Sequence, residues 1–505
     1  MVDFNNIREN IFIFNTISKK KEKFVPLEKD KIGMYVCGPT VYDDPHIGHG
    51  RAAIVFDVIY RFFKYIGFSI TNVRNYTDID DKIINRANDE GVDFLTISEK
   101  YIKSYEENMA ILNNLEPDYK PKVTEHIKEI IDLIQNIIDN GHGYVVNNNV
   151  YFDVKSFKEY GKLSGRNIEE LEQVSRIDND SDKRNPLDFA LWKKSKENEP
   201  FWTSPWGEGR PGWHIECSAM STKYLGKTFD IHGGGRDLIF PHHENEIAQS
   251  EAGFKQKFVN YWVHNGHVEI NKEKMSKSLK NFVSIGDAVK LIEPEAIRFF
   301  ILQTHYRSPI NYTFENLKIS ENNLLALYET KENFYNLKKE LSGSGDIATF
   351  LDNKNLSSEL KKIVKELLVS NDNFFQYLSD DFHTPKAVAL IFDYFTEINK
   401  ILVFKKIRKV SNISAVFELI DEFIKVINNT LGILHDEPKE FTSRVNLKRL
   451  KELNITEEEL NLIIKERIDA RKDKNWEKSD KIRDDLADKG IFLEDTPTGT
   501  KWRIQ

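Results

Sequence analysis

The segment formed by residues 31–75 constrains the fold of this chain more than any other. It opens with KIGMYVC, an apolar stretch typical of a buried strand, and a polar loop follows. Residues 46–67 then place apolar side chains near helical spacing up to Gly67, and residues 69–75 predict a second strand. A strand, a helix and a second strand in this order are typical of a parallel sheet. The segment therefore predicts an α/β domain whose parallel sheet carries helices on both faces.

The length of the chain and the changes in its local composition predict several domains. With 505 residues, the chain exceeds what one hydrophobic core supports, and about two to four domains are expected. From about Glu116 to Glu199, an Asn- and Gly-rich tract and a polar run (SRIDNDSDKR) predict an insertion into the first domain. After about residue 311 the pattern becomes helical, and residues 441–505 are highly charged.

Composition and cysteine usage favour a cytoplasmic protein. No apolar run reaches the roughly 18 residues that a membrane helix needs, and the segment 1–20 lacks the pattern of a secretion signal. The only two cysteines, Cys37 and Cys217, do not suggest a disulfide framework, and lone cysteines are most often buried thiols. The formal net charge of −8 argues against a general nucleic-acid binder, although a local basic track could still bind RNA.

Two histidines stand where the first long helix is expected to begin. In His46-Ile47-Gly48-His49, both imidazoles could donate hydrogen bonds to a triphosphate, and Gly48 would leave room for a nucleotide. A helix N-terminus also offers unpaired N–H groups and a partial positive charge. The alternative is a capped helix with two surface histidines, and these four residues alone leave both possibilities open.

A second short motif carries two lysines on a polar loop. In Lys274-Met275-Ser276-Lys277-Ser278, the two ammonium groups could neutralise the charge that develops on a leaving pyrophosphate. Taken alone, such a stretch is more often a solvated run of charges.

A His/Glu cluster follows the Gly-rich stretch HGGG. If Pro241 opens a helix, His242 and Glu246 lie four residues apart on one face, where both could reach one metal ion. Together with Cys37 and Cys217 they would form a zinc site. The alternatives are a surface His/Glu pair, or a zinc-dependent hydrolase that uses Glu244 as its base; the hydrolase would leave the lysine loop and the charged tail unexplained.

The two short motifs, in this order, resemble the HIGH and KMSKS motifs of class I aminoacyl-tRNA synthetases. Longer strings, MYVCGPTVYDDPHIGHGR, NYTDIDDKI, GRPGWHIECSAM, FDIHGGG and PHHENEIAQS, resemble the cysteinyl-tRNA synthetases in particular. The similarity extends from about Asn15 to Arg503. It implies a Rossmann-type, doubly wound catalytic domain that uses ATP with Mg²⁺ to activate L-cysteine and then transfers it to tRNA(Cys).

The resemblance also implies roles for particular residues. One Zn²⁺ would be held by Cys37, Cys217, His242 and Glu246. Catalysis by charge stabilisation would involve His46, His49, Lys274 and Lys277, and ATP would contact His46, Gly48, His49, Asp237 and Lys277. Thr77 and Trp213 would hold the substrate cysteine. The plain alternatives for Thr77, Trp213 and Asp237 are a turn threonine, a core tryptophan and an aspartate at a helix start. Zinc selection has a physical basis, because a thiolate is a softer and better zinc ligand than the hydroxyl of serine.

The family architecture implies further domains after the catalytic core, and a monomer is expected. The expected boundaries are 1–120 and 206–265 for the two halves of the catalytic domain, 121–205 for the inserted domain, 266–312 for the connecting segment, 313–440 for a helical bundle and 441–505 for a C-terminal anticodon-binding domain. In the last of these, a predicted helix would carry a basic stripe of Arg467, Arg471, Lys474 and Lys478 that could contact tRNA phosphates. Trp476 and Trp502 could stack on anticodon bases. The alternative is a helix laced with surface ion pairs, because acidic residues interleave with the basic ones.

Two rival functions share parts of this pattern. A cysteine ligase that acylates an amino-sugar would resemble the first two-thirds of the chain, but it would lack the charged C-terminal end. A non-catalytic RNA-binding paralogue would be expected to have lost residues of the motifs, and here none is lost. One departure is visible: Lys82-Ile83-Ile84-Asn85 replaces the KIIK of some family members. Side activities that need both lysines, such as persulfide synthesis, are therefore not expected here.

Overall fold

The computed structural model describes residues 2–167, 182–270, 273–274, 282–341, 343, 345–496 and 499–504. At its centre lies a four-stranded sheet with the order β11-β10-β3-β4, in which all neighbouring strands run parallel. The strands are β3 (Lys31–Val36), β4 (Ser69–Arg74), β10 (Phe229–Gly235) and β11 (Val259–Asn265). The predicted parallel α/β sheet is confirmed. From β3 the chain continues to β4 on one side of the sheet, and from β10 it continues to β11 on the other side. Parallel sheets bind ligands in the crevice at the carboxyl ends of two such central strands.

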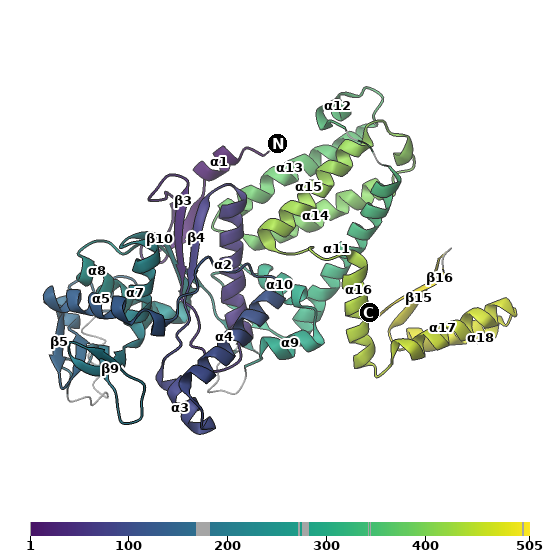
Figure 1. Ribbon diagram of the computed structural model, residues 1–505. Helices are drawn as coiled ribbons and strands as arrows, with labels where there is room; N and C mark the ends of the chain where they lie inside the picture. The colour runs from purple at the N-terminus through teal and green to yellow at the C-terminus, as the bar shows by residue number, and fades with distance from the viewer. Residues whose placement is uncertain are drawn as a thin grey trace.

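Helices cover both faces of this sheet (Figure 1). Helix α2 (Ile47–Tyr65) packs on one face and α7 (Trp213–Leu225) on the other; α5 (Ile127–Asp139) and α8 (Glu244–Phe254) pack against α7, α4 (Phe94–Ile111) packs against α2, and α3 (Asp81–Glu90) packs against α4. Successive side chains of β3 alternate between two apolar cores, since Met34 and Val36 belong to the core that contains α2, and Tyr35 to the core that contains α7. Cys37 continues this alternation and packs against the second core. The period of the strand therefore directs Cys37 toward α7.

A second sheet is formed by the stretch of chain between β4 and β10. It is antiparallel, with the order β5-β6-β7-β9-β8. The strands are β5 (Gly143–Val146), β6 (Asn149–Phe152), β7 (Phe189–Lys194), β8 (Trp202–Ser204) and β9 (Gly207–Pro211). It lies on the side of the central sheet away from the helical bundle (Figure 1). This sheet lies largely in the region predicted to be the insertion, and its strand β9 lies beyond residue 205 and ends at Pro211.

The remaining elements are small strands and a helical second half. The strands are β1 (Phe12–Asn15), β2 (Lys20–Lys23), β12 (Val268–Ile270), β13 (Glu273–Lys274), β14 (Ile310–Tyr312), β15 (Ile491–Thr496) and β16 (Gly499–Ile504). The helices are α1 (Phe4–Glu9), α9 (Ile285–Leu291), α10 (Pro294–Leu302), α11 (Phe314–Glu340), α12 (Ile347–Asp352), α13 (Ser358–Ser379), α14 (Thr384–Leu402), α15 (Ile413–Leu431), α16 (Pro438–Glu452), α17 (Glu457–Lys472) and α18 (Trp476–Ala487). Over the described part of the chain, no helix has the length and apolar character needed to cross a membrane.

A buried arginine joins the helical bundle to the central sheet. Arg298 of α10 is fully buried and forms an ion pair with Asp57 of α2. Its guanidinium also donates to the backbone oxygens of Leu431, at the end of α15, and of Leu112 and Asn113, just after α4. One side chain therefore ties together α2, α4, α10 and α15.

The predicted basic stripe near the C-terminus is not on one helix. Helix α17 ends at Lys472, Lys474 adopts a left-handed conformation with φ of 58°, and the Asn475 side chain accepts a hydrogen bond from the Lys478 N–H to cap α18. The prediction of a single continuous helix was wrong, because the capping chemistry of Asn475 starts a new helix in the middle of the stripe.

Candidate active site

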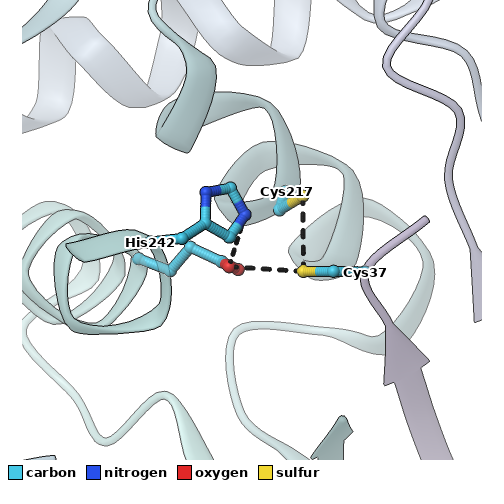
Figure 2. Close-up of side chains that lie close together, drawn as sticks. Cys37, Cys217 and His242 are labelled. Carbon is cyan, nitrogen blue, oxygen red and sulfur yellow. Dashed lines mark hydrogen bonds and ion pairs between the residues drawn. The ribbon is translucent and has the colours of Figure 1, made fainter. Parts of the chain in front are cut away.

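The four predicted metal ligands converge at the carboxyl end of the central sheet. Cys37 follows β3, Cys217 lies on α7, His242 lies in the turn Ile239–His243, and Glu246 lies in the first turn of α8. The Cys37 Sγ is 3.7 Å from the Cys217 Sγ and 3.5 Å from a Glu246 carboxylate oxygen, which is 3.1 Å from His242 Nε2. Figure 2 shows Cys37, Cys217 and His242 pointing toward one another. All four ligand atoms lie within 4.8 Å of one another.

The local backbone explains how distant segments meet here. Asn75, just after β4, accepts a hydrogen bond from the Gly38 N–H at 2.8 Å, and a Cβ at position 38 would collide with the Asn75 carbonyl oxygen. Glycine is therefore needed beside Cys37. Phe240 has an extended conformation, so the helical course that continues into α8 starts after it, at Pro241, as the spacing argument assumed. The predicted four-residue spacing of His242 and Glu246 still places the two side chains in contact.

The donor set fits zinc. Two thiols, one imidazole and one carboxylate are all groups that Zn²⁺ binds in four-coordinate sites. Burial, together with Cys217 and Glu246, raises the pKa of Cys37 well above its usual value. Burial lowers the pKa of His242 well below its usual value, which leaves the imidazole neutral, as a metal ligand must be. A positive ion placed between the thiols would favour their thiolate forms, and its binding would release protons.

Two histidines that sequence reasoning did not select support these ligands. The Nδ1 atoms of His214 and His242 lie 2.9 Å apart, so one of them carries the shared proton. His232 Nε2 is 2.8 Å from the second carboxylate oxygen of Glu246, and its ring stacks on Trp262. Both lie in strings that carry the family resemblance, WHIECS and FDIHGGG. A lone histidine in a sequence, however, gives no sign of where its ring points.

A second group of possible ligands overlaps the first. Cys37, His232, His243 and Glu246 also lie within 4.8 Å of one another. This set offers one thiol instead of two, and the Nε2 atom of its His232 is already engaged by Glu246. Because zinc favours thiolate sulfur, the set with both cysteines is the better zinc site. His243 Nδ1 is instead paired with His264 Nε2 at 2.7 Å.

Replacing His214 with phenylalanine is expected to weaken zinc binding by about 10- to 100-fold, the range typical of lost outer-shell partners. The variant would remove the group that fixes the tautomer and ring orientation of His242. Competition with a chromogenic chelator would measure the affinity. His142→Phe, in the inserted domain, is the matched control and should bind zinc like the wild type; equal affinities of the His214 and His142 variants would contradict this role.

The two residues expected to hold the substrate cysteine lie beside the cluster. Trp213 is 40% exposed, and its ring centroid is 4.5 Å from that of His242. Thr77 is buried, and its hydroxyl donates to a carboxylate oxygen of Glu216 at 3.1 Å. Burial raises the pKa of Glu216 well above its usual value. Trp213 is too exposed to be a core tryptophan, and the role of Thr77 in holding the substrate stays a prediction.

The two histidines of the first motif form a reciprocal cap on α2. His46 Nδ1 accepts from the N–H groups of Gly48 and His49, and His49 Nδ1 accepts from the N–H of His46. The expectation of unpaired N–H groups there was wrong for these positions, because the imidazoles satisfy them. Since both Nδ1 atoms are acceptors, each neutral ring carries its proton on Nε2 and can donate only from that atom. The rings stack at 3.8 Å.

Three more residues, Asp237, Lys274 and Lys277, were predicted to bind ATP or to act on its phosphates, and the structure describes only some of them in full. Asp237 is exposed in the turn Arg236–Leu238, directly after β10 at the crevice of the sheet. The backbone of Lys274 belongs to β13. The Lys274 side chain and the whole of Lys277 lie outside the described residues, so their predicted roles stay predictions.

The residues near the C-terminus that were predicted to contact tRNA differ in burial and in ion pairing. Arg467 is buried and forms two hydrogen bonds to Asp495, with which Arg471 also pairs. Trp502 packs against the small apolar core of this unit, whereas Trp476 is 57% exposed. Ion pairing, the alternative considered for this region, therefore occupies the two arginines. Trp476 remains the most accessible aromatic candidate among the predicted contacts.

Comparisons with known proteins agree with this architecture. Residues 23–322 match the family of class I (C) tRNA synthetase catalytic domains, residues 373–435 match the DALR domain, and residues 456–503 match the cysteinyl-tRNA ligase anticodon-binding domain. A solved structure of methionyl-tRNA synthetase from Mycobacterium tuberculosis, in complex with methionyl-adenylate, aligns with a TM-score of 0.60 at 13% identity. The alignment covers 81% of this chain and 93% of that one, which shows a shared fold.

The sheet, its crevice and the matched catalytic domain define a class I aminoacyl-tRNA synthetase. The cysteine–tRNA ligases of Trichlorobacter lovleyi and Geobacter metallireducens are 48% and 47% identical to this chain, over 98% of it and 99% of their own lengths. The chain belongs to the cysteine–tRNA ligase family. It is thus a ligase, and the resemblance found in its motifs is confirmed. The match at residues 456–503 also disfavours the amino-sugar ligase, which would lack that domain.

Proposed function

We propose that this enzyme activates L-cysteine with ATP and transfers it to tRNA(Cys), and that one Zn²⁺ held by Cys37, Cys217, His242 and Glu246 selects the substrate by its thiol. The convergence of these four ligand atoms beside Trp213 is the observation that carries the proposal. A hydroxyl in place of the thiol would be a poor zinc ligand, and shape alone discriminates weakly between such close analogues.

The proposed mechanism relies on positioning and charge. Trp213 and Thr77 would orient the amino acid so that its carboxylate approaches the α-phosphate of ATP. His46 and His49 would donate from Nε2 to phosphate oxygens, Asp237 would accept from the ribose, and Lys274 and Lys277 would neutralise the departing pyrophosphate. Mg²⁺ would accompany the ATP. The nucleophile belongs to the substrate, so the two cysteines serve as ligands and not as catalytic nucleophiles.

The domains would have different roles in the reaction. Residues 1–120 and 206–265, with the insertion 121–205 and the connecting segment 266–312, would carry the chemistry, and residues 313–440 and 441–505 would bind tRNA. The two arginines pair closely with Asp495, and Lys478 lies 3.8 Å from Glu466, so Lys474 is better suited to phosphate contacts than these three. We further propose that the protein is cytoplasmic, in keeping with two cysteines used as metal ligands and not in a disulfide, and that it is a monomer.

The direct test is a charging assay. Purified protein would be incubated with ATP, magnesium, total tRNA and labelled cysteine or labelled serine, and label in acid-precipitable RNA would be counted. Charging with cysteine and not with serine is the expected result. Activation of cysteine without any charging of tRNA would overturn the proposal.

Replacing Trp476 with alanine is expected to raise the KM for tRNA about tenfold, because stacking of one base on an aromatic ring is worth roughly 1–3 kcal/mol. Cysteine-dependent ATP–pyrophosphate exchange, which needs no tRNA, should stay unchanged. Leu462→Ala, at another exposed apolar position of the same unit, is the control. An unchanged KM for tRNA in the Trp476 variant would show that this ring does not contact the tRNA.

A further inference from the structure

Helix α9 supports the N-terminus of α2 from outside the sheet. The Ile47 N–H donates to the Val283 carbonyl oxygen at 3.1 Å, and the Ile285 N–H donates to the Pro45 carbonyl oxygen at 3.0 Å. These bonds form a short antiparallel bridge between His46 and Ser284. Ile285 is fully buried, and its side chain closes on Gly50 of α2. The backbone that carries the two capping histidines is therefore fixed on one side by the start of α9.

Helix α9 is too short to hold this position by itself. It has seven residues, and isolated helices below about 12–15 residues are marginal in water. Its C-terminal end leaves carbonyl oxygens without partners inside the helix. Lys448 of α16 meets that end: its Nζ lies 2.8 Å from the Val289 oxygen, 2.9 Å from the Ile292 oxygen and 2.8 Å from a carboxylate oxygen of Glu293.

The three donors of the Lys448 ammonium thus find three acceptors, and the charge lies at the negative end of the helix dipole. The rest of α16 is anchored independently. Arg449 bonds to Glu321 and to the backbone oxygen of Ile504, and Arg444 bonds to Glu293 at 2.9 Å. Loss of the Lys448 ammonium would therefore leave α16 in place and loosen the C-terminal end of α9, where the Val289 and Ile292 oxygens would lose their donor and Glu293 would keep Arg444.

We propose that Lys448 is a positioning residue for the reaction: by holding the C-terminal end of α9, it sets the place of the backbone that carries His46 and His49. This inference rests on the proposed role of those histidines in binding ATP. It assigns a part in amino-acid activation to a residue on a helix of the C-terminal half, which the sequence motifs did not indicate. Lys448 would touch neither ATP nor cysteine.

The test compares Lys448→Met, which keeps the length of the side chain and removes its charge, with Lys448→Arg and with Lys451→Met. Lys451 is exposed on the same helix and serves as the matched control. Cysteine-dependent ATP–pyrophosphate exchange would be measured without tRNA while ATP and cysteine are varied in turn. Small displacements of a site can cost up to about 100-fold in rate, so we expect kcat/KM for ATP to fall by about 10-fold or more in Lys448→Met.

The KM for cysteine and the zinc content should not change in this variant, Lys448→Arg should regain most of the activity, and Lys451→Met should match the wild type. Amide hydrogen exchange provides a second measurement that needs no catalysis: residues 285–292 and 46–49 should exchange faster in Lys448→Met. Unchanged kinetics for ATP, or equal losses for ATP and cysteine together with unchanged amide exchange, would overturn the inference. A wild-type protein without any exchange activity would instead overturn the catalytic assignment on which it rests.

Discussion

Replacing Cys217 with serine is expected to strip zinc from the protein and to lower cysteine activation by more than about 100-fold, beyond the range seen for outer-shell partners. The substitution exchanges a sulfur ligand for a hydroxyl of similar size, and hydroxyl oxygen is a poor ligand for zinc. Cys217 is buried and 3.7 Å from Cys37, so the serine hydroxyl would take the place of the sulfur within the ligand set. Zinc content after dialysis against a chelator and cysteine-dependent ATP–pyrophosphate exchange would measure the two effects.

Ser221→Ala provides the control for this substitution. Ser221 is buried on the same helix, one turn beyond Cys217, and its hydroxyl bonds only to the backbone oxygen of Ser218 among the interactions of the described chain. The control should retain zinc and activity. Full zinc content and normal activation in Cys217→Ser would refute the assignment of Cys217 as a ligand.

Replacing Arg298 with methionine is expected to lower the free energy of unfolding by about 3–5 kcal/mol, the usual cost of removing one partner of a buried ion pair. Asp57 would keep Arg61, at 2.7 Å, and the Leu115 N–H, at 2.8 Å, but it would lose its second cation, and three backbone oxygens would lose their shared donor. The loss would also loosen the attachment of the bundle to α2. Urea denaturation followed by circular dichroism would measure the change.

The matched control is Arg408→Met. Arg408 also pairs with one carboxylate, that of Glu340, but both side chains are more than half exposed. Exposed pairs contribute little, so this variant should unfold at the wild-type urea concentration. Equal midpoints for the Arg298 and Arg408 variants would show that the buried cluster does not hold the two halves of the molecule together.

The parts of the structure that follow a simple period could be predicted from the sequence. The strand that ends at Cys37, the helix after it and the strand that follows are found close to their expected places, because apolar periodicity and Gly67 mark them. The i, i+4 spacing likewise brought His242 and Glu246 together. The pairing of these two residues with two cysteines far away in the chain rested on family resemblance, because spacing alone does not bring distant segments together.

The parts that depend on side-chain direction could not be predicted. His214 and His232 support the ligands through ring orientations that only the packed structure fixes. His46 caps its own helix and so occupies backbone N–H groups that were expected to bind phosphate. The donor that remains at this position is the Nε2 atom of the His46 ring. In the tail, the hydrogen bond of Asn475 to the Lys478 N–H divides what the charge pattern suggested was one helix. Lys448 is a further example, since its role depends on where α9 ends in space.

The proposed selection of cysteine depends on direct binding of the substrate thiol to zinc. X-ray absorption at the zinc edge, recorded on the zinc-loaded protein alone, with cysteine and with serine, tests it most directly. Cysteine should raise the number of sulfur ligands from the two of Cys37 and Cys217 to three, and serine should leave it unchanged. An unchanged sulfur shell in the presence of saturating cysteine would contradict direct ligation and would place the selection of cysteine elsewhere in the pocket.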